Sequence, residues 1–165
     1  MIHPAQLPVD QLLAECQLAR TRRSGPGGQH RNKVETAVVV EHLPTGLKGE
    51  ASERRSQLQN RQAAIQRLRV RLALMVRHAP SGEPSAAWRQ RATSGRISVS
   101  TAHADYPALL AEALDVVHAH GFELSIAADH LGVTASQLVK LLKTEHAALD
   151  QVNRERHSLG LPPLR

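Results

Sequence analysis

The sequence predicts an α+β fold, in which a small β-sheet packs on a long basic helix and a helical C-terminal module follows. Residues 35–43 are rich in Val and Thr, and the turn residues Pro-Thr-Gly separate them from a second extended run at 47–52. This pattern favours a β-hairpin over 36–52. Apolar residues at helical spacing after position 53, and again beyond position 105, predict the helices.

Asp10 is a typical helix-capping residue and predicts a short helix that ends near Ala14. Residues 16–22 are expected to form a strand, and a glycine-rich loop that protrudes from the sheet follows them. The next helix is expected from about position 53 to position 78. Its apolar residues recur on one face and are Leu58, Ile65, Leu68, Leu72 and Met75. This helix is basic, because seven arginines accompany a single acidic residue.

The C-terminal half is predicted to be helical. One helix begins at Tyr106 and ends at Gly121, a typical C-cap residue. A short helix, a turn at Gly132 and one long helix over 136–158 are expected after it. Ala128, Gly132 and Leu138 have the spacing of a helix-turn-helix. The expected parts are a domain at 1–78, a basic linker at 79–104 and a helix-turn-helix-like module at 105–165.

The positive charge belongs to the first half of the 165 residues. Residues 1–78 carry 13 Lys and Arg against 6 Asp and Glu, whereas the remainder carries 8 against 9. A basic half-chain favours a polyanionic partner, most simply nucleic acid, although a merely basic surface is the alternative.

The composition also sets limits on other classes of site. A single cysteine, Cys16, excludes an intramolecular disulfide and a multi-cysteine zinc site. His118 and His120 fall on different faces of a helix, so we predict no metal and no cofactor. No apolar run reaches membrane-spanning length and no signal-peptide pattern is present, so a soluble cytoplasmic protein is expected. We also expect a monomer.

The most unusual segment is RSGPGGQHRNKVETAV, residues 23–38. Its glycines permit torsions closed to other residues and let the main chain approach a ligand. Their spacing fits neither a dinucleotide fingerprint nor a P-loop, and by itself the segment could be a plain flexible turn. It contains no Ser-His-Asp arrangement, paired carboxylates or metal cluster, so covalent or metal-assisted catalysis is not favoured. It does offer a backbone N–H and an amide side chain at Gln29.

Together with HLPTG, ERRSQLQNRQAA and RLRVRLAL further along, this segment resembles the catalytic domain of the class I peptide chain release factors over about residues 16–78. The resemblance implies hydrolysis of the peptidyl-tRNA ester in the ribosomal peptidyl transferase centre. It implies that Gln29, Gly28 and Gly27 are the catalytic residues. The Gln29 N–H would stabilise the transition state or the departing ribose hydroxyl, and its side chain would place water, while the glycines admit the backbone.

The resemblance further implies RNA contacts and partners. Contacts with large-subunit rRNA would come from the loop and the start of the basic helix, through Arg22, Arg23, Arg31, Lys33, Arg55, Gln57, Asn60 and Arg61. For the last four, ordinary helix capping and a solvated face remain equally open. The implied partners are the ribosome, P-site peptidyl-tRNA and a glutamine methyltransferase that acts on Gln29.

The chain is short for a codon-reading release factor, and no codon-reading tripeptide stands out. We therefore expect codon-independent release, as in the short factors that rescue stalled ribosomes. Unlike their strongly basic tails, the segment after Lys143 is mixed in charge. Two alternatives stay open: a non-catalytic rRNA- or ribosome-binding factor, and a helix-turn-helix DNA-binding regulator.

Overall fold

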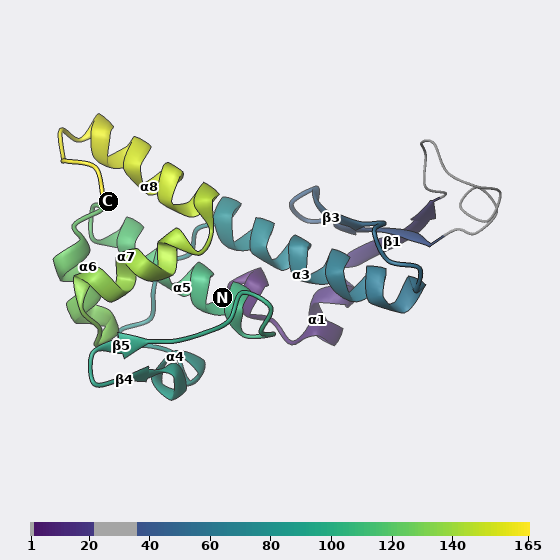
Figure 1. Cartoon of the computed structure of the whole chain (residues 1–165), viewed down its shortest axis with the longest axis horizontal. Helices are drawn as coiled ribbons and strands as arrows, with labels where there is room; N and C mark the ends of the chain where they lie inside the picture. The colour runs from purple at the N-terminus through teal and green to yellow at the C-terminus, as the bar shows by residue number, and fades with distance from the viewer. Residues whose placement is uncertain (1, 22–35) are drawn as a thin grey trace. The chain divides into compact units, whose positions relative to one another are not determined.

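The structure is a computed structural model that describes residues 2–21 and 36–165. It divides into two compact units, Leu7–Leu72 and a second unit that joins Met1–Gln6 to Ala73–Arg165 (Figure 1). The first unit holds 12 Lys and Arg against 6 Asp and Glu, whereas the second holds nine of each kind. All of the net positive charge therefore resides in the first unit.

A short helix and a three-stranded antiparallel sheet open the first unit. Helix α1 covers Val9–Ala14, and strands β1, β2 and β3 cover Cys16–Thr21, Ala37–His42 and Leu47–Ala51. The strand order is β1-β2-β3, with Cys16 opposite His42 and Val38 opposite Ala51. The α+β class, the hairpin and the first strand are thus confirmed.

The turn between β2 and β3 is closed by a hydrogen-bonded chain of side chains. His42 is buried, and its Nε2 lies 3.0 Å from the Glu15 carboxylate while its Nδ1 lies 2.8 Å from the Thr45 hydroxyl. Gly46 takes the left-handed conformation that the turn requires, with φ at +69°. The Pro-Thr-Gly sequence therefore builds the turn, and His42 ties it to the end of α1.

Helix α3, Gln57–Met75, lies along the sheet (Figure 1). Its buried face carries Ala64, Leu68 and Leu72. The closest approach is at Gly49 of β3, where an added Cβ would lie 2.5 Å from the Leu68 backbone nitrogen and closer still to the Ala64 carbonyl oxygen. A glycine is therefore required at position 49 for the strand to contact the helix backbone.

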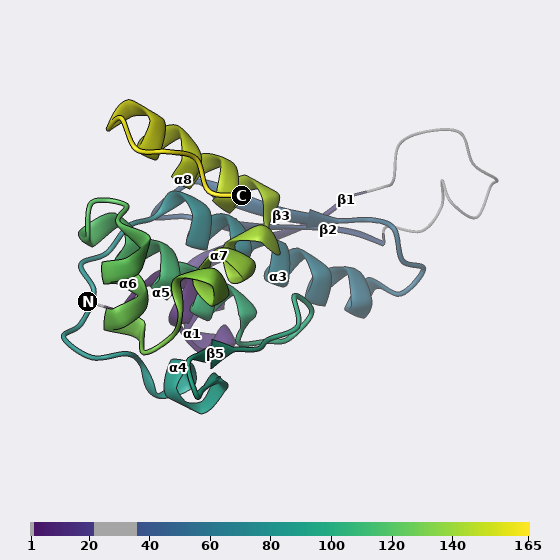
Figure 2. The same cartoon turned by 60° about the vertical axis from the view of Figure 1, so that its left-hand side comes forward.

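Helix α5, Tyr106–Ala119, is the central element of the second unit, and nearly every residue along it is buried. Helices α6, Leu124–Leu131, and α7, Ala135–Lys143, pack beside it (Figure 2). The short 3-10 helix Pro4–Gln6 also contacts α5. Helix α8, His146–Ser158, packs on α7. The last residues fold back on α8, because buried Arg156 donates to the Pro162 carbonyl.

Two expectations about this unit need correction. The long helix over 136–158 is broken into α7 and α8, because Glu145 is extended and caps the Ala147 N–H. The segment 79–104, expected as a linker, is structured and belongs to the second unit. It forms α4, Ala86–Arg91, and a hairpin of β4, Ala92–Thr93, with β5, Arg96–Ile97. Trp88 anchors it, because its ring is fully buried and its Nε1–H donates to the Leu131 carbonyl at 2.8 Å.

Candidate functional site

The candidate site is the end of the sheet where β1 leaves and β2 returns. Of the predicted site residues, seven lie outside the described residues: Gly27, Gly28, Gln29, Arg22, Arg23, Arg31 and Lys33. Thr21 and Ala37 are paired partners in the β1–β2 ladder. The last pair of the ladder therefore holds side by side the two strands that flank segment 22–35.

Asn60 of helix α3 holds Thr36, the first described residue after that segment. Its side chain is fully buried. Its Nδ2 group donates to the Thr36 carbonyl at 2.7 Å and to the Arg54 carbonyl at 3.0 Å, while its Oδ1 accepts the Arg54 N–H at 3.0 Å. Ser56 caps the helix, accepting the Gln59 N–H. All of these bonds are internal, so the buried Asn60 side chain ties the chain before α3 to the helix. They favour a structural role for Asn60, and its contact with RNA stays an untested prediction.

Arg55, Gln57 and Arg61 lie at the surface near the same end of α3. Arg55 and Arg61 are exposed and Gln57 is half-buried. Their contact with RNA stays a prediction. Arg61 also lines a groove with Arg20 of β1, a residue that the sequence reasoning missed. Only the strand register could have identified it, because Arg20 lies opposite Val38, whose side chain faces α3.

The other arginines of α3 differ in their surroundings. Arg67 donates to both carboxylate oxygens of Glu53, and these hydrogen bonds lower the pKa of Glu53 to about 2. Arg67 also donates to the Glu50 carbonyl, and Arg71 donates to the Lys48 carbonyl. Both guanidinium groups are therefore used to hold β3 and the loop after it, which leaves the start of α3 as the more available basic surface.

The second unit contains the geometry expected of a helix-turn-helix. Helix α6 ends at Gly132 in the left-handed conformation, with φ at +66°, and Thr134 caps α7 through the Gln137 N–H. Ala128 and Leu138 are buried between the helices, as their spacing predicts. The exposed side of α7 offers only Ser136, Lys140 and Lys143. DNA binding by this module stays a prediction without further support.

Residues 2–21 and 36–165 lack the features of two other classes of site. No three His, Cys, Asp or Glu side chains among these residues are grouped so that they could hold a metal ion. None of the described helices combines the length and apolarity that crossing a bilayer requires.

The family model and the relatives that match this chain agree on one family. The family model described as the RF-1 domain matches residues 9–106, which is more than half of the chain. Peptide chain release factor 1 of Kineococcus radiotolerans is 44% identical over 70 residues, 42% of this chain and 20% of that protein. The release factor 1-like mitochondrial protein of Rattus norvegicus is 43% identical over 75 residues, 46% of this chain and 18% of that protein.

A third relative, peptide chain release factor 1 of Leptothrix cholodnii, is 43% identical over 82 residues, half of this chain and 23% of that protein. The chain thus spans about one fifth of the length of the curated relatives it matches. The match covers the sheet, α3 and the first part of the second unit.

Proposed function

The chain belongs to the class I peptide chain release factor family, and from this premise we propose that it hydrolyses the ester of peptidyl-tRNA on the ribosome. The observation that carries the proposal is the Gly-Pro-Gly-Gly-Gln sequence at 25–29, placed between two paired strands of the family's domain. The proposed catalytic residues are Gln29, Gly28 and Gly27.

The chemistry that the residues supply is electrostatic. Ester hydrolysis places negative charge on oxygen in the transition state, and a preorganised N–H donor stabilises that charge. We assign this donor to the Gln29 backbone and the placement of water to its side chain. Removing one such donor typically reduces a rate by about 10²–10³. The ribosome would contribute the substrate and much of its orientation, so the protein alone should be a poor esterase.

The charge of the Leu7–Leu72 unit and the bonds on either side of segment 22–35 support a role on the ribosome. The net positive charge of the Leu7–Leu72 unit suits a partner made of RNA. The β1–β2 ladder and Asn60 hold the described residues on either side of the segment that carries Gln29. Arg22, Arg23, Arg31, Lys33, Arg55, Gln57 and Arg61 are the residues that we propose contact rRNA.

The test is peptide release from ribosomes stalled with peptidyl-tRNA. Wild-type protein should release the peptide, and Gln29→Ala and Gly28→Ala should reduce the rate by about 10² or more. Gln62→Ala is the matched control, because Gln62 is an exposed glutamine on α3 with no role in the proposed chemistry. Ribosome binding without release by the wild type would instead favour a non-catalytic rRNA-binding factor.

The same assay tests the finer proposal of codon-independent rescue. The support is that no codon-reading tripeptide stands out in the sequence. Release should then proceed at similar rates with a stop codon, a sense codon or no codon in the ribosomal A site. A strict requirement for a stop codon would reject this part and leave the hydrolysis in place.

We further propose that Gln29 is the target of a glutamine methyltransferase and that the protein works in the cytoplasm, where ribosomes are found. Mass spectrometry of the protein purified from its own cells tests the modification. A mass increase of one methyl group on the peptide containing Gln29 is expected, and an unmodified peptide would contradict it.

A further inference from the structure

A groove lies between strand β1 and the first turns of α3, inside the Leu7–Leu72 unit. Its volume is about 310 Å³, and it is lined by Leu18, Ala19, Arg20, Val38, Gln57, Leu58 and Arg61. Helix α3 approaches the sheet most closely at Gly49 of β3, and β1 is the edge strand on the opposite side. The side chains of β1 that face α3 are therefore left half open.

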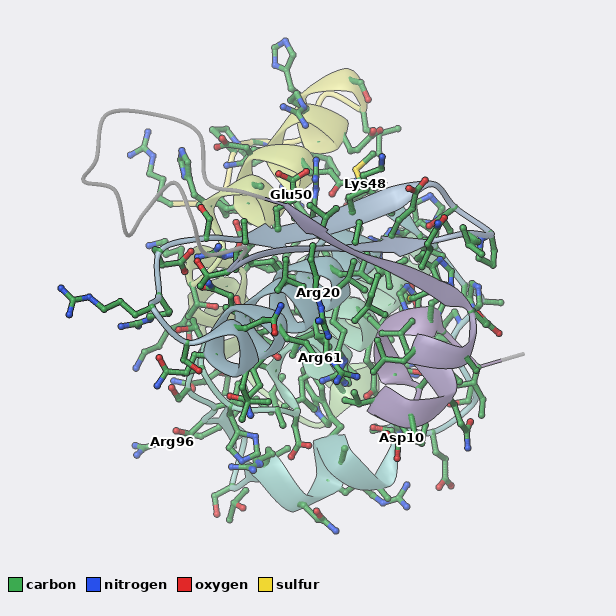
Figure 3. The ribbon with its side chains drawn as sticks, turned by 90° about the vertical axis from the view of Figure 1, so that its right-hand side faces the viewer. Asp10, Arg20, Lys48, Glu50, Arg61 and Arg96 are labelled. Carbon is green, nitrogen blue, oxygen red and sulfur yellow. The ribbon has the colours of Figure 1, made fainter. Side chains whose placement is uncertain are left out.

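The groove combines an apolar floor with positive charge. Leu18 is 41% exposed and Leu58 is 64% exposed, although both are large apolar side chains. Arg20 and Arg61, which come from β1 and α3, lie near the middle of the face in Figure 3. Neither arginine makes an ion pair with another described residue, and no acidic residue lines the groove.

This combination matches the chemistry of a nucleotide. Guanidinium groups bind phosphate through paired hydrogen bonds, and apolar side chains or guanidinium planes cover the face of a base. The volume is at the lower end of the roughly 300–1,000 Å³ typical of small-ligand sites, which suits one nucleotide. In a duplex the base faces are stacked inside, so only an unpaired nucleotide could reach the floor.

We propose that this groove binds one unpaired RNA nucleotide, with its phosphate between Arg20 and Arg61 and its base against Leu18 and Leu58. The proposal rests on the proposed function in that the RNA would be ribosomal. It adds a binding site, distinct from the Gln29 chemistry, that would hold the base of the catalytic segment in register on rRNA.

The direct test uses the full chain and a fluorescein-labelled single-stranded RNA heptamer, with binding followed by anisotropy over a range of salt. Leu58→Ala should weaken binding by about fivefold or more, without changing the salt dependence. Arg20→Gln with Arg61→Gln should lower the slope of log affinity against log salt by about 0.7, the value for one phosphate on a single strand.

Two matched variants separate the groove from the general surface. Leu43→Ala removes an exposed leucine at the hairpin turn, and Arg96→Gln removes an exposed arginine in the other unit. Both should bind the heptamer like the wild type. Equal losses from Leu58→Ala and Leu43→Ala would overturn the proposal, as would duplex RNA binding that depends on Leu58 as strongly as single-stranded binding does.

Release assays distinguish this proposal from the proposed function. On stalled ribosomes, the groove variants should raise the protein concentration needed for half-maximal release and leave the maximal rate unchanged, whereas Gln29→Ala should lower the maximal rate. If the wild type released no peptide, the proposed function would fail. Binding of the RNA heptamer would still test whether the groove holds a nucleotide. If the groove variants match the wild type in both assays, the proposal of a nucleotide site in the groove is rejected and the proposed hydrolysis is unaffected.

Discussion

Replacing Asn60 with alanine should destabilise the unit that carries the proposed catalytic segment. The change removes three hydrogen bonds, of 2.7, 3.0 and 3.0 Å, and leaves the Thr36 carbonyl and both backbone groups of Arg54 without these partners. A net value of about 1 kcal/mol for each bond gives a loss of about 3 kcal/mol in the free energy of unfolding.

The assay is urea unfolding followed by far-UV circular dichroism, combined with hydrogen exchange at the β2 amides. Tryptophan fluorescence would not report on this change, because the only tryptophan, Trp88, lies in the other unit. Gln62→Ala is the control on the same helix and should cost less than about 0.5 kcal/mol, since it is exposed.

Asn60→Asp sharpens the test. The aspartate keeps an oxygen for the Arg54 N–H, but it places its second oxygen against the two carbonyls that Nδ2 now reaches. It should therefore be no better than alanine above the pKa of the carboxyl group. An unchanged urea midpoint in both variants, together with weaker ribosome binding, would refute the structural role of Asn60. That result is expected if the Asn60 side chain contacts RNA.

Three further predictions concern packing and pH. Gly49→Ala should lower the free energy of unfolding by about 3 kcal/mol, because the new Cβ meets the α3 backbone. Gly82→Ala is the control, since a Cβ there meets nothing, and equal urea midpoints for the two variants would refute the contact. Trp88→Phe should cost about 2 kcal/mol by thermal unfolding, since it leaves the Leu131 carbonyl without its bond; no loss would mean that the bond contributes nothing. Burial, more than any other cause, lowers the pKa of His3, whose ring is neutral in its bonds to Ala5 and Val76. The unfolded chain therefore binds a proton at His3 more readily than the folded chain does. The contribution of His3 to the free energy of unfolding should be constant above about pH 6.5 and fall as the pH drops below it. His3→Gln should lessen that fall in urea midpoints measured at pH 7.5 and 5.5, and an identical fall would contradict the assignment.

Local patterns in the sequence were sufficient for much of the first unit. The Val-rich run, the Pro-Thr-Gly turn and the spacing of Leu68 and Leu72 predicted the hairpin and α3 because each depends on neighbouring residues. The sequence could not separate a surface Asn60 from a buried one, since both fit a helix start. Burial follows from the position of Thr36, which is 24 residues away in the chain.

The second unit shows the same limit. A continuous helical pattern over 136–158 hid the break at Glu145, whose side chain accepts the Ala147 N–H in the first turn of α8. A polar segment with Gly and Pro was expected to be a linker, yet Trp88 fixes it through a bond to Leu131, 43 residues away. Contacts between such distant residues leave no periodic signal in a single sequence.

The sequence by itself determined the chemistry that this protein offers: a glycine-bordered glutamine, a basic half-chain and the motifs of one family. Those properties reside in residue types and short spacings. Only the tertiary structure decided that Asn60 anchors the segment, that Arg67 and Arg71 hold β3, and that Arg20 and Arg61 share a groove. These roles depend on which side chains the strand register and the approach at Gly49 bring together, and that is set by packing across the whole unit.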